Sequence, residues 1–359
     1  MIIDSDAHVE ESIATWKYLE PEFYPYRPIP IQLPEDTCFG SHNAGWIIDY
    51  KFRIHAANPT LMKRAQEKEI PIPVQELTDV AGRLGYMDAL GVDKQVIFPS
   101  LWLGCPSDNV ELEAALARSY NRFMAHQCNQ SDGRLWYAAV LPWRRADLAV
   151  QELKLLKKLG SVAGIFVHGI EWDIPLTHPS FQPIYEEAER QDLPITVHTG
   201  NGSSPTITRM FEGMPRVGPK SFPFIHPATQ GLINGPYVAY GFTQVLDSEL
   251  LDEFPKLRVA FLEAGCEWAV SIVSNMHRKK QAMELLGDRV FVGCLPREDL
   301  GYVTSKLGDG FLVTATDFPH GDPFREDQLA QGLKSRGDIS EPTIEKILAG
   351  NPQRLYRFN

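Results

Sequence analysis

Two potential metal ligands lie two residues apart near the start of the chain, where Asp6 and His8 come at the end of a short apolar run. Residues i and i+2 of a β-strand point to the same side, so both side chains can bind one ion. His198 and Asp317 each end a later apolar run. Three expected strand ends therefore offer two imidazoles and two carboxylates, which is a ligand set typical of a divalent metal site.

Near-continuous apolar runs alternate with segments that have apolar residues at helical spacing. Strands buried on both faces of a parallel sheet have this pattern, whereas half-exposed antiparallel strands alternate polar and apolar residues. Eight such runs predict an α/β fold, a (β/α)8 TIM barrel. The expected strands are Ile2–His8, Lys94–Pro99, Leu135–Leu141, Val162–His168, Pro194–His198, Leu257–Leu262, Arg289–Gly293 and Phe311–Thr316, and the expected helices are Leu77–Leu90, Val110–Cys128, Ala146–Leu159, Phe181–Gln191, Val238–Phe254 and Glu267–Leu286.

Two long stretches interrupt this alternation, at about 12–73 after the first strand and about 201–236 after the fifth. We expect one barrel domain over residues 1–359, because α/β barrels of this length form a single domain. The insertions leave the carboxyl ends of strands, which is the catalytic face of such barrels, so we interpret them as lids or partner-contact arms. A C-terminal helix closed by Gly350 is expected to follow the eighth strand.

Closure of the barrel is what brings the four ligand candidates together. The carboxyl ends of strands one, five and eight surround one mouth, so Asp6, His8, His198 and Asp317 can meet there. Buried carboxylates without counter-charges are costly, and a bound divalent cation neutralises them. The alternative is a cluster of structural residues, because a buried histidine needs only some hydrogen-bond partner.

Charge and composition exclude several functions. A net charge of -11 argues against nucleic acid as a partner, since phosphate binding needs a positive surface. The apolar runs are too short to cross a membrane, and the start lacks the basic stretch and apolar core of a signal peptide. Five scattered cysteines without a Cys-x-x-Cys motif fit a reducing compartment, so we expect a cytoplasmic protein.

These residues and motifs resemble the amidohydrolase superfamily, in the branch typified by aminocarboxymuconate-semialdehyde decarboxylase. The resemblance extends from Asp6-x-His8 to the closing sequence Gly-Asn-Pro-Gln-Arg-Leu-Tyr at 350–356, and its most specific part is Thr-Asp-Phe-Pro-His at 316–320. In that branch the first strand supplies an acidic-x-His pair, the fifth a His and the eighth an Asp. The resemblance therefore implies Asp6, His8, His198 and Asp317 as ligands of Zn²⁺ or Mn²⁺.

One departure from the branch concerns the sixth strand. Family members commonly carry a His there that helps to activate the metal-bound water, whereas this chain has Glu263. A carboxylate near a cation can accept a proton, with a basicity set by burial and neighbours. The alternative is that Glu263 only hydrogen-bonds a neighbouring strand or a metal ligand.

Other polar residues near the expected mouth are candidates for substrate contact. His168 ends the fourth strand and Glu11 follows the first, and each either contacts substrate, orients a ligand or only makes local hydrogen bonds. His320 either holds substrate or fixes the eighth-strand loop. Arg144 can receive a substrate carboxylate through paired donors, although solvent-exposed arginines with no such role are common.

The preferred function is non-oxidative decarboxylation of a small carboxylated cyclic or unsaturated substrate, with Asp317 as proton donor and Glu263 and His198 as further catalytic residues. Metal-dependent hydrolysis or hydration is the first alternative, and a barrel that binds without catalysis is the second. The resemblance and the apolar insertions also lead us to expect a homo-oligomer, a dimer or larger.

Overall fold

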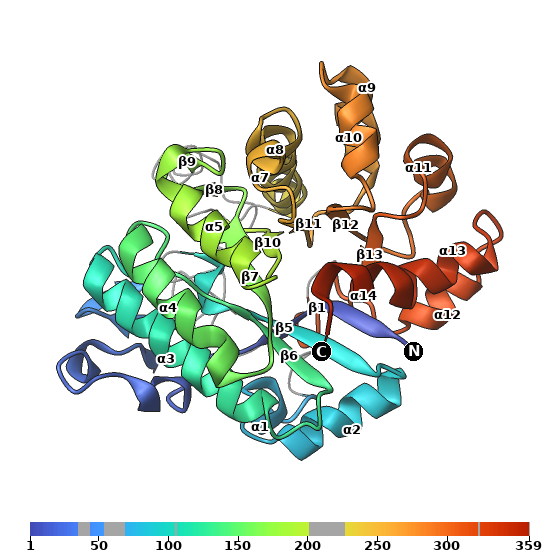
Figure 1. Ribbon diagram of the computed structural model, residues 1–359. Helices are drawn as coiled ribbons and strands as arrows, with labels where there is room; N and C mark the ends of the chain where they lie inside the picture. Colours follow the sequence, from blue (N-terminus) through green and yellow to red (C-terminus); the bar gives the residue numbers. More distant parts are fainter. Residues whose placement is uncertain (35–43, 54–68, 105, 201–226, 322–323, 359) are drawn as a thin grey trace.

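Eight parallel strands form the inner layer of the computed structural model, which describes residues 1–34, 44–53, 69–104, 106–200, 227–321 and 324–358. Helices surround the strands (Figure 1), and the predicted barrel is confirmed. The strands follow one another around the sheet in chain order. They are β1 (Ile3–Val9), β5 (Lys94–Pro99), β6 (Leu135–Ala139), β7 (Val162–His168), β10 (Ile195–His198), β11 (Val259–Phe261), β12 (Val290–Cys294) and β13 (Leu312–Thr314).

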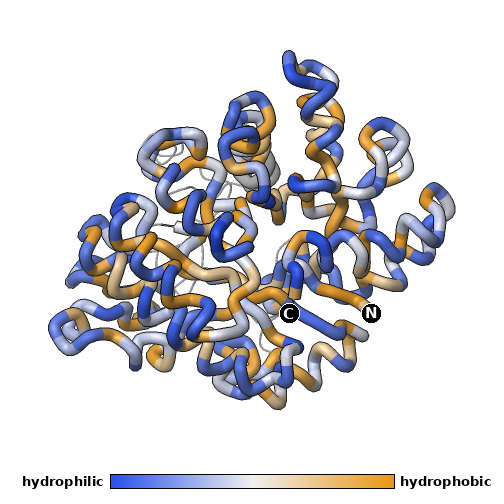
Figure 2. Tube along the Cα trace, viewed as in Figure 1, coloured by the Kyte–Doolittle hydropathy of each residue, from blue (hydrophilic) through white to orange (hydrophobic). Residues whose placement is uncertain are grey.

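The helices of the outer layer carry hydrophobic and hydrophilic residues in alternation along the trace (Figure 2), as expected for helices with one face on the strands. Asp79 caps α2 by accepting from the Gly82 amide, and Gly91 ends that helix with a φ of 70°. The helices are α1 (Ile72–Gln75), α2 (Val80–Leu90), α3 (Val110–Cys128), α4 (Ala146–Leu159), α5 (Gln182–Arg190), α7 (Pro227–Leu246), α8 (Leu250–Glu253), α9 (Glu267–Asn275), α10 (Lys279–Leu285), α11 (Leu300–Leu307), α12 (Leu329–Lys334), α13 (Glu341–Glu345) and α14 (Asn351–Tyr356).

The seam between β13 and β1 closes the barrel without a regular ladder. The Asp317 amide donates to the Asp6 carbonyl over 3.0 Å, and the His8 amide donates to the Phe318 carbonyl over 2.5 Å. Deeper in the seam, the buried Asp4 carboxylate accepts from the amide of Thr316 at 2.8 Å and from its hydroxyl at 2.5 Å. Burial raises the pKa of Asp4 to about 6, although these hydrogen bonds act in the opposite direction. The seam therefore fixes the two strands that carry Asp6, His8 and Asp317.

The closing motif at 350–356 is part of the fold's support. The side-chain amide of Asn351 donates through Nδ2 to the backbone carbonyls of Asp309 and Leu312 over 2.8 and 2.7 Å. The Tyr356 hydroxyl donates to the Ser5 carbonyl of β1 over 2.7 Å. The motif thus ties α14 to both strands of the seam.

The C-terminal helix does not end at Gly350, so that prediction was wrong. Gly350 has a helical φ of -62° and lies in a π-helical turn, Lys346–Gly350, that continues into α14. The helix ends instead where Arg357 adopts a left-handed φ of 48°. A glycine favours termination but does not force it, and here the contacts of Asn351 hold the next turn in place.

Two other expected helices have different bounds. The segment expected at Val238–Phe254 begins at Pro227 as α7, contains Pro236 within the helix, and is divided from α8 after Leu246. The segment expected at Glu267–Leu286 is divided into α9 and α10 at Met276, which has an extended backbone. The second insertion therefore ends by residue 226, and its residues 201–226 lie outside the described part of the chain.

The first insertion contains a small antiparallel sheet that the sequence analysis missed. Its strands are β2 (Ile29–Gln32), β3 (Ala44–Ile48) and β4 (Lys51–Arg53), with β3 in the middle. A two-residue pair, β8 (Ile170–Glu171) with β9 (Ile174–Pro175), follows β7. Among the described helices, none combines the length and apolar character that crossing a membrane requires.

Candidate metal centre

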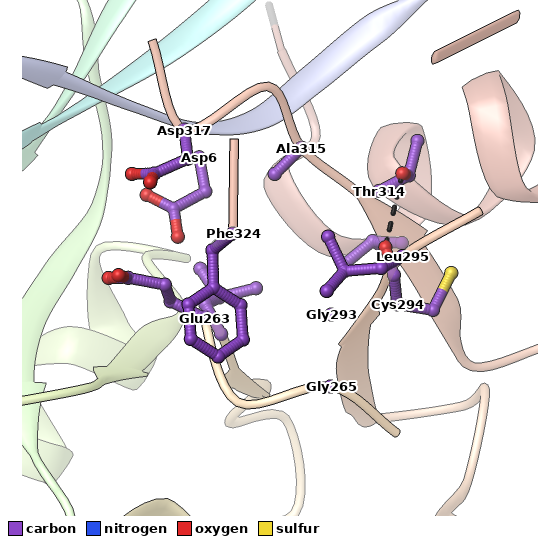
Figure 3. A pocket seen from close by; sticks show the side chains of 12 residues that line it. Asp6, Glu263, Gly265, Gly293, Cys294, Leu295, Thr314, Ala315, Asp317 and Phe324 are labelled. Carbon is purple, nitrogen blue, oxygen red and sulfur yellow. Dashed lines mark hydrogen bonds between the residues drawn. The ribbon is translucent and has the colours of Figure 1, made fainter. Parts of the chain in front are cut away.

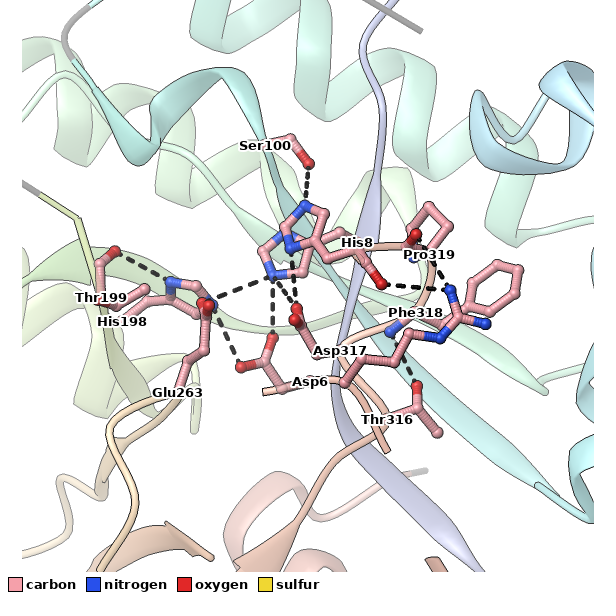
Figure 4. Close-up of polar contacts among 12 residues, drawn as sticks. Asp6, His8, Ser100, His198, Thr199, Glu263, Thr316, Asp317, Phe318 and Pro319 are labelled. Atoms are coloured by element: carbon pink, nitrogen blue, oxygen red, sulfur yellow. Dashed lines mark hydrogen bonds and ion pairs between the residues drawn. The ribbon is translucent and has the colours of Figure 1, made fainter. Parts of the chain in front are cut away.

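Asp6 and His8 lie two residues apart on β1, and both side chains point into the barrel mouth (Figure 4). His198, at the end of β10, and Glu263, just after β11, point to the same place. All four side chains are at most 3% exposed. One ligand atom from each lies within 4.8 Å of the others. The structure therefore brings the predicted ligands Asp6, His8 and His198 together with Glu263, and the fourth predicted ligand, Asp317, lies beside them with its Oδ1 3.4 Å from His8 Nε2.

A backbone carbonyl contacts the Nδ1 atom of each imidazole, on the side away from the centre. Nδ1 of His8 lies 3.2 Å from the Pro99 carbonyl, and Nδ1 of His198 lies 3.0 Å from the Thr199 carbonyl. A carbonyl oxygen only accepts, so each Nδ1 donates its proton to that carbonyl and each Nε2 faces the centre. Both Nε2 atoms lie opposite carboxylate oxygens, so either a proton on Nε2 or a metal ion must lie between them, and an Nε2 without a proton can serve as a metal ligand.

The distances between these atoms fit one shared ion. Ligand atoms about 2.1 Å from an ion are about 3.0 Å apart at right angles and about 3.4 Å apart in a tetrahedron. His198 Nε2 lies 3.0 Å from Glu263 Oε2 and 3.2 Å from Asp6 Oδ2. His8 Nε2 lies 3.6 Å from Asp6 Oδ1 and 4.0 Å from Glu263 Oε2. Nitrogen and carboxylate donors in this number suit Zn²⁺ or Mn²⁺.

Three potential ligand atoms of Asp6 and His198 lack hydrogen bonds to the described residues. Neither oxygen of the Asp6 carboxylate forms a hydrogen bond with any described residue, and neither does His198 Nε2. Both side chains are almost fully buried. A buried charge left in this way is costly unless an ion binds it, so the residues present fit a divalent metal.

Asp317 belongs to a second, overlapping group with His8 and His320. Its Oδ1 lies 3.4 Å from His8 Nε2 and 2.9 Å from Nδ1 of His320. The other nitrogen of His320 is 3.0 Å from the Ser100 hydroxyl and 3.6 Å from Glu10. The His320 ring also stacks on His8 with the ring centres 3.9 Å apart. His320 therefore orients Asp317 at the edge of the centre.

Two residues of the centre have left-handed backbones. Glu263 has a φ of 51° and Asp317 a φ of 55°. An L-residue with this conformation is uncommon, and for a glutamate it costs of the order of 1 kcal/mol. Backbone strain of this kind collects at functional sites, where it aims a side chain that a regular strand end would turn away.

A small cavity opens beside the centre, between the carboxyl ends of β11, β12 and β13. Figure 3 shows the carboxylates of Asp6, Glu263 and Asp317 together on one side of it, with the ring of Phe324 next to them. Most of the remaining wall is apolar or small, which suits a small ligand with one charged end. The lining residues are Asp6, Leu262, Glu263, Gly265, Gly293, Cys294, Leu295, Val313, Thr314, Ala315, Asp317 and Phe324.

His168 lies beside the centre, at the end of β7 and in register with His198 on the neighbouring strand. Its Nδ1 is 2.6 Å from a carboxylate oxygen of Glu171, which also accepts from the His168 amide at 3.0 Å. Its Nε2 is buried and has no hydrogen-bond partner in the described residues. Glu171 was not predicted from the sequence, although a carboxylate three residues after a strand-end histidine is a readable signal.

Glu11 and Arg144 form hydrogen bonds with loop segments that follow the barrel strands. The Glu11 carboxylate accepts from the amides of Ser100 and Leu101 at 3.2 and 2.8 Å, and burial raises its pKa to about 8. The Arg144 guanidinium donates to Glu113 at 2.5 Å and to the Ser107 carbonyl at 2.8 Å. Neither residue lines the cavity beside the centre.

A parallel barrel with a buried group of imidazoles and carboxylates at its carboxyl end defines a class of metal-binding barrel enzymes. A family model for amidohydrolases matches residues 48–298, which is more than half of the chain. The chain therefore belongs to the amidohydrolase family, and it is an enzyme of this superfamily, as predicted.

Known proteins agree with this assignment. A gamma-resorcylate decarboxylase of Rhizobium sp. (strain MTP-10005) is 26% identical over 317 residues, covering 81% of this chain and 90% of its own. An amidohydrolase of Mycobacterium avium subsp. paratuberculosis K-10 superposes with a TM-score of 0.79 at 16% identity, covering 99% of this chain and 97% of its own. A dihydroxybenzoic acid decarboxylase of Polaromonas sp. JS666, with bound manganese and the inhibitor 2-nitroresorcinol, superposes with a TM-score of 0.61 at 16% identity. The match covers 99% of this chain and 96% of the Polaromonas chain.

Proposed function

We propose that this protein is a metal-dependent decarboxylase that removes CO₂ from a small carboxylated ring without an oxidant. The observation that carries the proposal is the meeting of Asp6, His8 and His198 at one buried point beside a cavity with acidic residues on one side. The names of the relatives support the reaction, and the manganese of the Polaromonas structure supports the kind of ion.

Asp6, His8 and His198 would hold a divalent ion, either Zn²⁺ or Mn²⁺. When bound, such an ion supplies a Lewis acid that attracts the oxygens of an anionic substrate. The apolar wall of the cavity then holds the ring and excludes water from the reacting carbon.

Asp317 is proposed as the proton donor. Its carboxyl group gives a proton to the ring carbon as the bond from that carbon to the carboxylate breaks and CO₂ leaves. The electron pair of the broken bond remains on the ring carbon and forms the new bond to hydrogen. His320 keeps the Asp317 carboxyl group in place through its 2.9 Å contact with Oδ1. Water restores the proton of Asp317 after turnover.

His168 is proposed as a substrate-binding residue, because its buried Nε2 has an unused capacity for a hydrogen bond while Glu171 fixes the ring. Glu11 and Arg144 are proposed to act through the loops that they hold, Glu11 through the segment that presents Ser100 to His320.

The experiment is turnover of a panel of dihydroxybenzoates by the manganese-loaded protein in D₂O and, separately, in H₂¹⁸O. We expect CO₂ release, one deuterium at the carbon that carried the carboxylate, and no ¹⁸O in the product. Asp317→Asn should reduce kcat by more than about a hundredfold, as expected for loss of an acid catalyst. Uptake of ¹⁸O with retention of the carboxylate would instead show hydrolysis or hydration and overturn the proposal.

We also propose that the chain forms a homo-oligomer in the cytoplasm. Tyr50, Phe52 and Ile29, on or beside the small sheet of the first insertion, are 72%, 44% and 38% exposed, and apolar surface of this kind is commonly covered by a partner. Cys128, Cys266 and Cys294 are free and buried, which fits a reducing compartment. Light scattering and cell fractionation test the two statements, and a monomer would remove the first.

A further inference from the structure

The interior of the barrel is filled unevenly around the metal centre. Side chains at alternate positions of each strand point inward and fill the barrel in layers. Phe98 on β5 and Phe166 on β7 belong to the inward set, because the centres of their rings lie 5.2 and 5.7 Å from the centre of the His198 ring. Two large rings therefore fill the side of the interior that these strands face.

Gly293 of β12 faces the same interior from the other side of the barrel. Paired residues of a parallel sheet point to the same face, and the pairs that lead from β10 to β12 are Thr196 with Ala260 and Ala260 with Phe291. Thr196 precedes the inward His198 by two residues, and Gly293 follows Phe291 by two. Gly293 is thus an inward position without a side chain, and it lines the cavity beside the centre.

This cavity has an acidic side and an apolar side (Figure 3). The three carboxylates of the centre gather on the acidic side. Neither oxygen of the buried Asp6 carboxylate forms a hydrogen bond with a described residue, so this side has unused capacity to bind a ligand through a cation. Away from the carboxylates, the labelled wall includes small or apolar groups: Gly293, Leu295 and Ala315.

Two polar side chains also line the apolar side, and neither offers a strong partner to a ligand. The Thr314 hydroxyl donates its proton to the Cys294 carbonyl over 3.2 Å. Burial raises the pKa of the Cys294 thiol well above its ordinary value, so the thiol stays neutral and packs like a small apolar group. A ligand hydroxyl placed here would lose its water without a good replacement, whereas a methyl group would gain from burial.

We propose that this cavity is a subsite for an apolar substituent of the substrate ring, and that Gly293 determines this specificity by leaving the space for it. The charged end of the substrate lies at the acidic side, and a group of about the size of a methyl projects toward β12. The inference rests on the proposed function, because it names the class of ring acid: one with an alkyl group, rather than a further hydroxyl group, at the ring position that faces β12.

Gly293→Ala tests the subsite because it fills the space without straining the backbone. A Cβ atom at this position would lie 3.4 Å from the Cα of Leu262 and 3.6 Å from the backbone nitrogen of Glu263, which are ordinary van der Waals contacts. Gly310→Ala is the matched control: its Cβ would meet its nearest neighbours at 3.7 Å, just before β13 and so at the opposite end of the barrel. Neither glycine has a positive φ.

The experiment is calorimetric titration of the Mn²⁺-loaded protein with 2-nitrophenols, which have the shape of a hydroxybenzoate but no carboxylate to lose. The series carries hydrogen, methyl or hydroxyl at each remaining ring position in turn. At one position we expect the wild-type protein to bind the methyl compound at least about tenfold more tightly than the hydroxyl compound. Gly293→Ala should weaken binding of that methyl compound by about tenfold and of the unsubstituted compound by less than about threefold, and Gly310→Ala should behave as the wild type.

Equal binding of the methyl and hydroxyl compounds at every position would overturn the inference, and so would a lack of binding by the wild-type protein. An equal loss for the methyl and unsubstituted compounds in Gly293→Ala would overturn the role of Gly293. The wild-type comparison needs no variant, so it decides the matter even if Gly293→Ala fails to fold.

Release of CO₂ from the corresponding benzoates distinguishes failure of this inference from failure of the proposed function. Decarboxylation without a preference for the methyl group would remove the subsite alone. A binding preference for the methyl group without release of CO₂ from any benzoate would leave the subsite and remove the decarboxylation.

Discussion

Phe98 packs against the rings of His8 and His198, the two imidazoles proposed as metal ligands, and its removal should affect both stability and metal binding. The side chain lies on β5 and is fully buried. Its ring stacks on His198 with the ring centres 5.2 Å apart and the planes inclined by 26°. The centre of the His8 ring lies 6.3 Å away. Phe98→Ala removes the ring that packs against both imidazoles.

The expected magnitude follows from the cavity left behind. Replacing a buried Phe by Ala costs about 3 to 5 kcal/mol of the free energy of unfolding, because apolar burial is lost and the interior collapses only in part. Phe98→Leu keeps most of the volume and should cost about 1 kcal/mol. The Kd for Mn²⁺ should rise about tenfold or more in Phe98→Ala, since the two rings lose the contact that holds their orientation.

The assay is urea unfolding in EDTA, so that metal binding does not contribute to the measured free energy. Titration with Mn²⁺ follows on the same preparations. Phe181→Ala is the matched control: Phe181 is equally buried, but its ring packs on Trp143 at 5.2 Å, outside the metal centre. It should cost a similar stability and leave Mn²⁺ affinity as it is. If Phe98→Ala costs less than about 1 kcal/mol, or if both variants weaken Mn²⁺ binding equally, the reasoning is refuted.

Three further predictions concern the base of the barrel and the ion. Arg258→Met should cost about 2 to 4 kcal/mol at pH 7, because the buried guanidinium donates to the Leu355 carbonyl and to Asp192 at 2.7 and 2.5 Å. Burial tends to raise the pKa of Asp192, but the neighbouring Arg258 outweighs burial and lowers it. The stabilisation by this ion pair is therefore present at neutral pH and is lost as the pH falls and Asp192 is protonated. The difference in the free energy of unfolding between Arg258→Met and wild type should narrow in acid, and a difference that stays constant would contradict this reasoning. Asn351→Ala should cost about 2 to 4 kcal/mol in the same assay, because the Asp309 and Leu312 carbonyls lose the side-chain amide that donates to them. A cost below about 0.5 kcal/mol would show that water replaces the amide. Mn²⁺ at about one hundred times its Kd should stabilise the wild-type protein by about 2.7 kcal/mol, seen as a higher Tm than in EDTA, and an equal Tm would argue against the metal centre.

The barrel could be predicted because burial dominates the sequence of its strands. Every residue of β7 is buried and nearly all of them are apolar, a continuous character that sequence reveals directly, whereas β1 is equally buried but carries polar residues of the site and the seam. The convergence of Asp6, His8 and His198 could be predicted from barrel closure alone. A closed barrel brings the carboxyl ends of its strands together however far apart they lie in the sequence. The small sheet of the first insertion was missed because its pairing depends on contacts between Ile29–Gln32 and Ala44–Ile48 rather than on a strong local pattern.

The part of the site that sequence did not predict depends on backbone turns. Glu263 could be recognised as a departure from a family pattern, but its place beside His198 depends on a left-handed residue, which sequence does not reveal for a glutamate. The Gly350 prediction was wrong for a related reason: glycine permits many conformations, and the contacts of Asn351 select the helical one.

The seam between β1 and β13 joins the first strand of the barrel to the last, so the barrel closes only when both parts of the chain are present. The hydrogen bond from the Thr316 amide to Asp4 spans 312 residues, nearly the whole chain. During synthesis Asp6 and His8 leave the ribosome early, whereas Asp317 emerges late, so the seam closes one of the longest loops in the fold and the entropy cost of closing it is correspondingly large. A nascent chain that stops short of β13 therefore has an unclosed barrel without Asp317, and the complete site appears only in a finished polypeptide.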